Sequence, residues 1–525
     1  VGLLYVREGA PFTPLMAGGG QEGSLRSGTE NMAGIAALGA VLTALEQGNV
    51  FAPAAELQAR RQRLVGALRA AFPGIVFNAP LDLSLPTTLN FSVPGFSARQ
   101  LLDLFDAAGL RLSGGSACGA ARAQPSDVLQ AMGLPGWQTA AAVRLSFGAA
   151  DDEALIAGAC AALARCAQAL RASCELPGAA TVGPLPPLTR FVVDGACCYL
   201  LADPASRRCV LIDPLPELSE RLGLWLRCRQ ARLLAVLDTH SHGDHASSAA
   251  ELRRQLADLL EPATAPDALG WPQGVQALEL GERWLTRLAL PGHTADSTAY
   301  LLHGVEGIRL ALVGDTVLPG ALGRSDFAQS APEQYAGSLH RLLQTVGEQT
   351  LLLPGHDYEH RLACTLALER QAQPLLDGVL SGQLDAAAFA LAKAQLEQDL
   401  GPTEYQTLAC GARVDCADPS SEAIEITPDA LRARLLQGGP APWLVDVREP
   451  YEQELGGLPE LPGLQTRALP LSLLPGELPL PPDTPLFFIC RSGNRSAQVA
   501  KALRRLGHGQ AWSVAGGLAL WPAQI

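Results

Sequence analysis

Three histidines and an aspartate lie within the short stretch 239–245 of the sequence. The apolar run 233–238 before it predicts a buried strand, and residues 246–260 after it predict a helix. His and Asp are common metal ligands, and so many of them on one strand-to-helix loop are difficult to explain without a metal ion. We therefore expect a metal site that draws on His240, His242, Asp244 and His245.

Three more ligand-type residues follow apolar runs that predict strands. They are His293 after 284–290, Asp315 after 308–313 and His356 after 350–353, each in a Gly-containing loop. Such a set could bind two Zn or Fe ions, with a bridging hydroxide that attacks a carbonyl. Alternatively, two His and one Asp could bind a single iron and leave one face open for dioxygen and a thiolate. The residue types alone leave both arrangements open.

A second chemical feature is Cys490, which follows the apolar run 486–489 and precedes an expected helix at 497–506. A Cys between a strand and a helix N-terminus faces backbone amides. Together with the helix dipole and two arginines, these amides favour a thiolate or a persulfide. The loop that we expect to surround the sulfur consists of Arg491, Ser492, Gly493, Asn494, Arg495 and Ser496.

Two Gly-rich stretches occur near the start of the chain. Residues 18–31 precede an expected helix at 32–46, which suits an anion site and an ordinary helix cap equally well. Residues 113–119 place Cys118 among Gly, Ser and Ala. We expect this thiol to be accessible and mobile, as a nucleophile that must travel needs to be.

Composition limits the function classes. The net charge of -13 argues against nucleic acid as a partner, because phosphate binding needs clustered Lys and Arg. No uninterrupted apolar run reaches the ~18–20 residues of a membrane span, and no basic-then-apolar leader is present. We therefore expect a cytoplasmic protein with reduced thiols, since the twelve cysteines fit no small secreted disulfide framework. Cys160, Cys166, Cys174, Cys197 and Cys198 are expected to be small buried hydrophobes.

Strands and helices alternate through the middle of the chain, which predicts a layered α/β sandwich at 188–415. Pro- and Gly-rich residues at 175–187 predict a linker before it. The Ala- and Leu-rich segment 361–406 is expected to form helices that close the domain. Cys197 and Cys198 are adjacent in a predicted strand, so their side chains should point to opposite faces. The remaining histidines, His303, His340, His360 and His508, are expected at the surface.

The His and Asp series resembles the HxHxDH…H…D…H pattern of the metallo-β-lactamase superfamily, which implies an αββα sandwich. Residues 323–327 and 356–358 closely resemble segments of persulfide dioxygenases, which oxidise glutathione persulfide to sulfite and glutathione. By this resemblance, His240, His293 and Asp315 bind one Fe(II) per chain, in preference to Zn or a binuclear centre, and Arg324 and Tyr358 contact glutathione. The implied outer hydrogen-bonding network, or second metal site, consists of His242, Asp244, His245 and His356.

Residues 1 to about 155 resemble the C-terminal part of pyridoxal-phosphate-dependent cysteine desulfurases through GLLYVREG, GGGQEGSLRSGTEN, SGGSACGAARAQPSDVLQAMGL and VRLSFG. The resemblance implies that Cys118 takes the sulfane sulfur, that Arg144 holds the substrate carboxylate and that Thr29 reaches the cofactor phosphate of the partner subunit. The family's Schiff-base lysine would precede Val1, and the first Lys here is Lys393. We therefore expect pyridoxal phosphate and desulfuration only in an intact parent protein.

The segment 422–525 resembles a single rhodanese (sulfurtransferase) domain through DVR, CRSGNRS and VAGGLALW, which implies that Cys490 carries sulfane sulfur. It departs from the family at 454–458, where a Gly-His-Ile stretch is usual. We therefore predict an α/β multidomain protein: a partial aminotransferase-like region at 1–175, a metallo-β-lactamase-fold domain at 188–415 and a rhodanese domain at 422–525.

The three regions share persulfide chemistry, which favours Fe(II)-dependent oxidation of glutathione persulfide coupled to rhodanese sulfur transfer. The expected reactants are glutathione persulfide, O2, and thiosulfate or sulfite. We also expect a homo-oligomer that binds neither a membrane nor nucleic acid. One alternative is a glyoxalase II-like binuclear thioester hydrolase. Another is a non-enzymatic sulfur-relay scaffold in which Cys118 and Cys490 only receive and pass persulfide.

Overall fold

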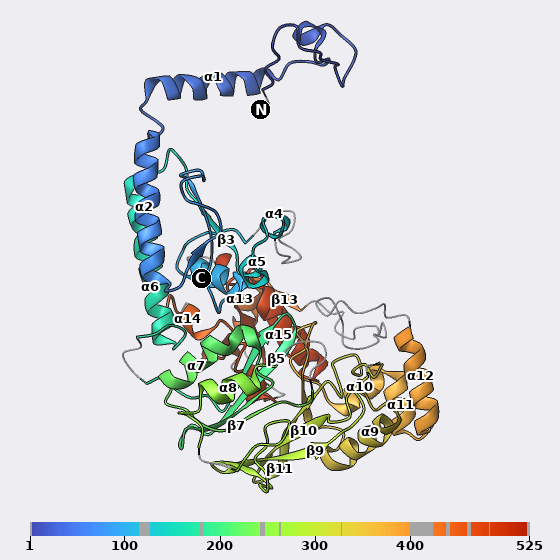
Figure 1. The fold of residues 1–525 in the computed structure, drawn as a ribbon. Coiled ribbons are helices and arrows are strands. Elements are labelled where there is room, and N and C mark those ends of the chain that lie inside the picture. Colours follow the sequence, from blue (N-terminus) through green and yellow to red (C-terminus); the bar gives the residue numbers. More distant parts are fainter. Residues whose placement is uncertain are drawn as a thin grey trace. The chain divides into compact units, whose positions relative to one another are not determined.

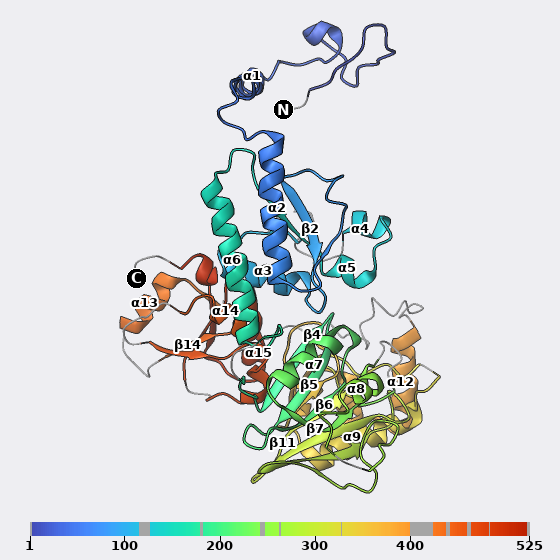
Figure 2. The same ribbon diagram turned by 60° about the vertical axis from the view of Figure 1, so that its left-hand side comes forward.

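The structure is a computed structural model that describes residues 3–114, 126–178, 182–241, 247–261, 264–326, 328–398, 424–436, 442–458, 464–481 and 484–521. The chain divides into two units. The first contains residues 1–93 and 111–164, and the second contains 94–110 and 165–525. Figure 1 and Figure 2 show the fold from two sides, coloured along the sequence.

The first unit contains an antiparallel sheet in the order β1-β2-β3. Burial alternates along β3, where Val143 and Leu145 are buried and Arg144 and Ser146 are exposed, as a strand with one covered face requires. The helix α1 exposes most of its apolar side chains. The elements of this unit are α1 (Met32–Gln47), α2 (Ala54–Ala71), β1 (Val76–Phe77), β2 (Thr88–Ser92), α4 (Asp127–Ala131), α5 (Gly136–Ala140) and β3 (Val143–Ser146).

The helix α6 (Glu153–Ala172) begins in the first unit and ends in the second. By length and mean hydropathy this helix could cross a membrane. The sequence did not suggest this, because the helix contains no uninterrupted apolar run of membrane-spanning length. In the structure, 39% of its most apolar 18-residue stretch is buried. Its buried residues recur at helical spacing, at Ile156, Leu163, Ala167 and Leu170. Core helices of globular proteins meet the same two criteria, and the one-sided burial of α6 is typical of them.

The middle of the chain forms two facing sheets. The four-stranded sheet has the order β4-β5-β6-β7 and the five-stranded sheet the order β12-β11-β10-β9-β8. In each sheet one neighbouring pair is parallel, β6 with β7 and β11 with β12, and the other pairs are antiparallel. The strands are β4 (Leu188–Val193), β5 (Ala196–Ala202), β6 (Arg208–Ile212), β7 (Arg232–Leu237), β8 (Leu278–Leu280), β9 (Arg283–Ala289), β10 (Thr298–Gly304), β11 (Gly307–Gly314) and β12 (Leu351–Pro354).

Side chains alternate along these strands between the two sheets and the outer helices. In β5, Cys197 and Tyr199 pack into the core between the sheets, whereas Cys198 and Leu200 pack outward against α7 and α8. The expectation that Cys197 and Cys198 face opposite ways is therefore confirmed. The outer face of the second sheet packs in the same way against α9, through residues such as Leu339. Burial on both faces explains why these strands are nearly continuous apolar runs in the sequence.

The outer helices complete an αββα sandwich (Figure 1). The expected helix 246–260 is shorter in the structure, where α8 ends at Gln255. Segment 361–406 contributes three helices in its described part, as expected. The helices are α7 (Ser219–Cys228), α8 (Ala249–Gln255), α9 (Pro332–Val346), α10 (Leu366–Ala372), α11 (Pro374–Leu380) and α12 (Ala386–Gln398).

The last part of the chain is a five-stranded sheet with the order β13-β17-β16-β14-β15, in which all neighbouring strands are parallel. The central strand β16 is buried along its whole length. The elements are β13 (Glu425–Ile426), α13 (Pro428–Leu436), β14 (Trp443–Asp446), α14 (Pro450–Gln453), β15 (Gln465–Ala468), β16 (Leu486–Ile489), α15 (Asn494–Arg505) and β17 (Ala511–Val514). The helix α3 (Ala98–Ala107) also belongs to the second unit, although it comes much earlier in the sequence.

The structure corrects four expectations. Cys160 is only partly buried, because it lies at the edge of the buried face of α6. Cys174 is not a free thiol but forms a disulfide with Cys228. His508 is buried rather than at the surface, and its Nε2 lies 2.8 Å from the carbonyl oxygen of Pro481. The expected linker after residue 175 is partly packed: Glu175 and Leu185 are buried. Pro and Gly enrichment indicated that this segment is irregular, but not whether it is exposed.

Candidate functional site

The candidate metal site lies at one end of the sandwich, where three strands finish. His240 follows β7, His293 follows β9 and Asp315 follows β11. One ligand atom from each residue lies within 4.8 Å of the others, and all three residues are buried. The structure thus brings together, from three separate loops, the three residues expected to bind iron.

The two imidazoles are oriented by hydrogen bonds at Nδ1. In His293, Nδ1 lies 2.6 Å from the carbonyl oxygen of Arg324 and must donate to it. In His240, Nδ1 lies 2.9 Å from Thr239 Oγ1, and this hydroxyl in turn donates to Asp213 at 2.9 Å. Both arrangements place the proton on Nδ1 and the lone pair on Nε2. This is the tautomer that a metal requires, and such outer partners also fix the ring orientation.

The carboxylate of Asp315 is held on one side only. Its Oδ1 lies 2.9 Å from Nδ1 of His356. Its Oδ2 is buried, has no hydrogen-bond donor among the described residues and lies 3.8 Å from Nε2 of His293. Burial alone would raise the pKa of Asp315, but His356, His293 and His240 outweigh it and hold this pKa well below its ordinary value. A buried, ionised carboxylate oxygen that faces two imidazole nitrogens fits a bound cation.

Two glycines allow the surrounding loops to approach Asp315 closely. A Cβ on Gly355 would lie 2.5 Å from Asp315 Oδ1, and a Cβ on Gly323 would overlap the Asp315 carbonyl oxygen. Both glycines occur in the motifs singled out in the sequence. Close backbone approach to the carboxylate is thus a physical reason for glycine at these two positions.

The two residues expected to contact glutathione lie on loops beside this site. Arg324 is buried, and its Nε donates to Asp326 at 2.9 Å. Tyr358 is 37% exposed, and its ring stacks on His356 at a centroid distance of 5.4 Å. Arg324 therefore contacts the metal site through its carbonyl group, and Tyr358 contacts it through His356.

Two buried ion pairs that the sequence analysis missed anchor these loops. Asp357 accepts hydrogen bonds from Arg190 of β4 at 2.8 Å and from the backbone amides of Arg361 and Leu362. Lys393 and Glu397 of α12 form the other pair, and Glu397 also accepts from the Ser325 amide at 3.0 Å. An Arg within an otherwise buried strand pattern and a Lys–Glu pair four residues apart on a helix were the available signals.

The sulfur of Cys490 lies where the buried strand β16 meets α15. It accepts a hydrogen bond from the Gly493 amide at 3.2 Å and lies 3.5 Å from Ser496 Oγ. Gly493 has a φ of 94°, a left-handed conformation that favours glycine at this turn into α15. From the other side Gly517 approaches so closely that a Cβ there would overlap the Cys490 carbonyl oxygen. One backbone amide and one hydroxyl of the expected loop thus lie at this sulfur.

The remaining loop residues have defined positions. Arg495 forms a two-point ion pair with Glu452, and Arg491 pairs with Asp106 of α3. Asn494 begins α15, and Ser492 precedes Gly493 in the loop. Because both arginines have carboxylate partners, the positive charge of the loop is partly compensated.

Several predicted residues lie outside the described part of the structure: Cys118, His242, Asp244 and His245. Thr29 is exposed, and its carbonyl oxygen accepts a hydrogen bond from Arg26. Arg144 is exposed on β3, and its backbone pairs with Ser113, just before the Cys118 loop. Residues 1–156 contain no Lys to form a Schiff base. The residues present therefore do not fit covalent binding of pyridoxal phosphate.

Comparison with known families finds a match for each part of the chain. Residues 1–156 match Aminotransferase class-V, residues 193–356 match the Metallo-beta-lactamase superfamily and residues 427–524 match the Rhodanese-like domain. The chain is 40% identical over 155 residues to the cysteine desulfurase IscS of Clostridium botulinum, covering 29% of this chain and 39% of the relative. It thus spans about two fifths of the length of that desulfurase.

The central domain is similar to persulfide dioxygenases. The chain is 30% identical over 197 residues to the mitochondrial persulfide dioxygenase ETHE1 of Bos taurus and of Homo sapiens, covering 36% of this chain and 76% of each relative. Among solved structures, ETHE1 from Myxococcus xanthus has 27% identity and a TM-score of 0.35, with coverage of 42% of this chain and 93% of that one. The chain is an α/β multidomain protein that belongs, through its central domain, to the persulfide dioxygenase ETHE1 family of the metallo-β-lactamase superfamily, and it joins this domain to class-V aminotransferase and rhodanese-like regions.

Proposed function

We propose that the central domain oxidises glutathione persulfide to sulfite and glutathione with one Fe(II) bound by His240, His293 and Asp315. The observation that carries this proposal is the buried His-His-Asp cluster, whose ligand atoms lie within 4.8 Å of one another. Two imidazoles and one carboxylate are the ligand set of many iron(II) oxygenases, and they leave coordination positions for substrates. Bound iron would supply the one-electron chemistry that the reaction of O2 with a persulfide requires.

The position of His356 supports one metal rather than two. Its Nδ1 lies 2.9 Å from Asp315 Oδ1, so this ring orients the carboxylate and leaves Oδ2 on the side of His293. Residues in such outer positions usually tune a metal ligand instead of binding a second ion. A binuclear thioester hydrolase would use His356 as a ligand.

Two residues on the loops next to the site would bind the substrate. The Arg324 guanidinium could pair with a glutathione carboxylate in place of Asp326, because Arg binds carboxylates through two parallel hydrogen bonds. Tyr358 is partly exposed and offers a ring and a hydroxyl beside His356. Both would fix the glutathione moiety so that its terminal sulfur lies toward the metal ligands.

The test measures oxygen uptake and metal content on the same iron-loaded chain. Oxidation consumes one O2 and one water per glutathione persulfide and yields glutathione, sulfite and two protons. We expect one iron per chain, and sulfite equal to the O2 consumed. The matched control is Asp315→Asn, which removes the ionised oxygen but keeps the shape of the side chain. Two metals per chain with turnover of S-lactoylglutathione would instead establish the hydrolase, and protein-bound sulfane sulfur without metal-dependent turnover would establish a relay scaffold.

We further propose that Cys490 transfers sulfane sulfur between thiosulfate and glutathione. The Gly493 amide and the N-terminus of α15 stabilise a thiolate at Cys490, which attacks the outer sulfur of thiosulfate. That step breaks the S–S bond of thiosulfate, leaves a Cys490 persulfide and releases sulfite. Glutathione then takes the sulfur and becomes the substrate of the metal site. Cys490→Ser should abolish thiosulfate consumption and leave oxygen uptake with added glutathione persulfide intact.

For the aminotransferase-like region we propose a sulfur-carrying role only in an intact parent protein. Its Cys118 would accept sulfane sulfur there, with Arg144 and Thr29 binding substrate and cofactor. In these 525 residues the only lysines are Lys393 and Lys501, and Lys393 is paired with Glu397. Incubation of this chain with pyridoxal phosphate and cysteine should therefore release no sulfide above the rate of the cofactor alone.

A further inference from the structure

The segment that follows α6 is attached to α7 by a disulfide and by several polar contacts. Cys174 is the second residue after α6 and has a φ of 64°, which turns the chain back at the helix end. Its sulfur is bonded to that of Cys228, the last residue of α7, at a Cα–Cα distance of 5.8 Å. Glu175 and Arg221 form a buried ion pair beside it. The segment after α6 is thus held to α7 by a covalent bond and by a buried ion pair.

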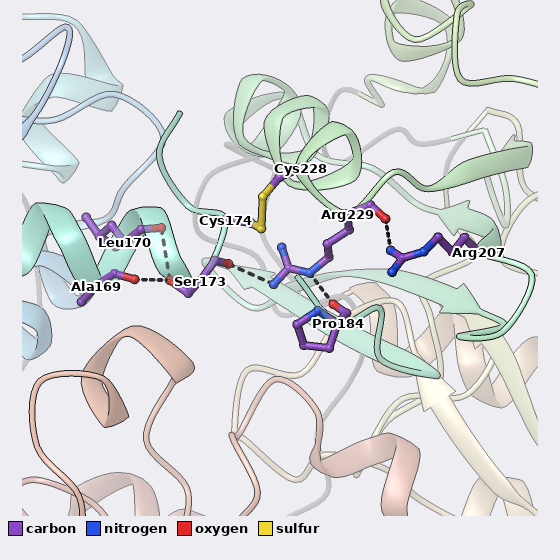
Figure 3. The surroundings of a disulfide bond; sticks show 8 residues. All are labelled: Ala169, Leu170, Ser173, Cys174, Pro184, Arg207, Cys228 and Arg229. Carbon is purple, nitrogen blue, oxygen red and sulfur yellow. Dashed lines mark hydrogen bonds between the residues drawn. A yellow bond between two sulfur atoms is a disulfide. The ribbon is translucent and has the colours of Figure 1, made fainter. Parts of the chain in front are cut away.

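The guanidinium of Arg229 lies next to this disulfide (Figure 3). It donates from Nε to the Pro184 carbonyl oxygen at 2.7 Å and from Nη2 to that of Ser173 at 2.9 Å. Its Nη1 is buried and has no hydrogen-bond partner among the described residues. A Cβ on Gly183 would lie 2.9 Å from Cys174 Sγ and 3.7 Å from Arg229 Cζ, so the sulfur and the guanidinium both lie close to this glycine.

The two sulfur-bearing residues differ in exposure. Cys174 is fully buried, whereas Cys228 is only partly buried. An incoming thiolate can therefore reach Cys228 more readily than Cys174. The residue that would leave, Cys174, is the one beside the buried cation of Arg229. A positive charge next to a leaving thiolate stabilises it and speeds exchange.

We propose that Cys174 and Cys228 are a redox-active pair that low-molecular-weight thiols of the glutathione class open by attack at Cys228. The thiolate forms a bond to Cys228 Sγ, the Cys174–Cys228 bond breaks, and its electron pair leaves on Cys174, next to Arg229. A second thiolate then attacks the small molecule's sulfur in the mixed disulfide, the bond from that sulfur to Cys228 Sγ breaks, and the small disulfide leaves while Cys228 keeps the electron pair. The pair gains two electrons, the two small thiols lose them, and their protons end on the two cysteines.

Opening affects the element that leads to the metal site. Cys228 ends α7, and after three residues the chain enters β7, which is followed by His240. When the disulfide is closed, it restricts the unfolded chain across a sequence separation of 54 residues. After opening, only the Arg221–Glu175 pair and the Arg229 hydrogen bonds among the contacts described above attach this segment to α7.

The first test follows the redox state of each cysteine in the full chain. The protein is equilibrated at pH 7 in mixtures of reduced and oxidised glutathione, alkylated, and mapped by mass spectrometry. We expect Cys174 and Cys228 to change state together, and a glutathione adduct to form at Cys228 and not at Cys174. Cys197 and Cys209 are the internal controls, because burial raises the pKa of both thiols to about 12 and keeps them unreactive. A glutathione adduct on Cys174, or no disulfide even in excess oxidised glutathione, would overturn the proposal.

The second test uses variants. Cys174→Ser should accumulate the mixed disulfide at Cys228, since no internal thiol can displace it. Arg229→Gln should slow opening about tenfold, whereas Arg229→Lys, which keeps the charge, should slow it less. Oxidation should raise the melting temperature of the native chain by about 5–10 °C and leave that of Cys228→Ser unchanged. Equal shifts in melting temperature for the native chain and Cys228→Ser would show that this disulfide does not cause the stabilisation. Equal opening rates for Arg229→Gln and Arg229→Lys would show that the charge of Arg229 does not speed the opening.

Discussion

The metal site and the Cys490 loop both lie at strand ends, but the chain builds them differently. His240, His293 and Asp315 come from three loops that are far apart in the sequence, and their geometry depends on the packing of two sheets. The hydrogen-bonding groups around Cys490 come from residues that directly follow it, at the start of α15. The first site therefore depends on the stability of the whole sandwich, and the second depends on one strand, one loop and one helix.

The largest effect should separate the two sites completely. Asp315→Asn removes the ionised oxygen of the metal site, so metal content and oxygen uptake should fall to background, a loss of more than about 100-fold, since outer-sphere changes alone cost 10–100-fold. Thiosulfate consumption should be unchanged, because Cys490 and its loop have no part in that ligand set. The measurements are metal analysis, an oxygen electrode and a thiosulfate assay. Cys490→Ser is the reciprocal control, and loss of both activities in either variant would contradict the independence of the sites.

The next largest effect concerns the buried Arg190–Asp357 ion pair, which anchors the loop that carries His356. Arg190→Leu leaves the buried carboxylate of Asp357 without its cation, which should lower the free energy of unfolding of the central domain by about 3–5 kcal/mol. Urea unfolding followed by fluorescence measures this loss. Adding Asp357→Asn removes the unpaired buried charge and should restore part of the lost free energy of unfolding. If the double variant is less stable than Arg190→Leu, the buried charge is not the cause.

A smaller effect should show that both sites need close backbone approach. Gly323→Ala would place a methyl group against the Asp315 carbonyl, and Gly517→Ala would place one against that of Cys490. Each should cost about 1–3 kcal/mol of local stability, and each should lower only the activity of its own site. Gly509→Ala is the control, because its Cβ would have no heavy atom within 4 Å. Equal loss of both activities in Gly323→Ala would argue for general unfolding instead.

The smallest effect should come from the anchor on α12. Glu397→Gln keeps an oxygen for the Ser325 amide but removes the charge that pairs with Lys393. Because Ser325 follows the Arg324 carbonyl that orients His293, metal affinity should fall by up to about tenfold. Titration of the apo chain with Fe(II) measures it. The exposed Glu348→Gln is the matched control and should bind metal like the native chain.

The sequence allowed most of the Cys490 site to be predicted, because its parts are contiguous. The strand, the loop and the helix that follow one another at 486–505 place Gly493 and Ser496 at the sulfur without further information. The sequence also predicted His240, His293 and Asp315 as metal ligands, since each follows an apolar run and lies in a Gly-containing loop, and the structure brings the three together. The ring orientations were not predicted. The partners of His240 and His293 are Thr239, Asp213 and the Arg324 carbonyl, and no local pattern indicates which hydrogen bonds these groups make.

Pairings between distant segments could not be deduced from local patterns. Arg190 and Asp357 meet because β4 lies beside the loop after β12, and Cys174 meets Cys228 because the turn after α6 lies against the end of α7. Counting cysteines predicted reduced thiols, whereas the structure joins Cys174 to Cys228 among the cysteines it describes. The buried position of His508 follows in the same way from the path of the chain around Pro481.

The backbone and the side chain of Arg324 make separate contacts, and this separation has a consequence for engineering the proposed activity. Its carbonyl oxygen orients His293, and every amino acid has such a carbonyl, while its guanidinium, which is paired with Asp326, is the part proposed to bind a substrate. Substitutions here should therefore change which thiol compounds are accepted without loss of the catalytic ion. Position 324 is thus a suitable first choice for libraries that seek activity on persulfides other than that of glutathione.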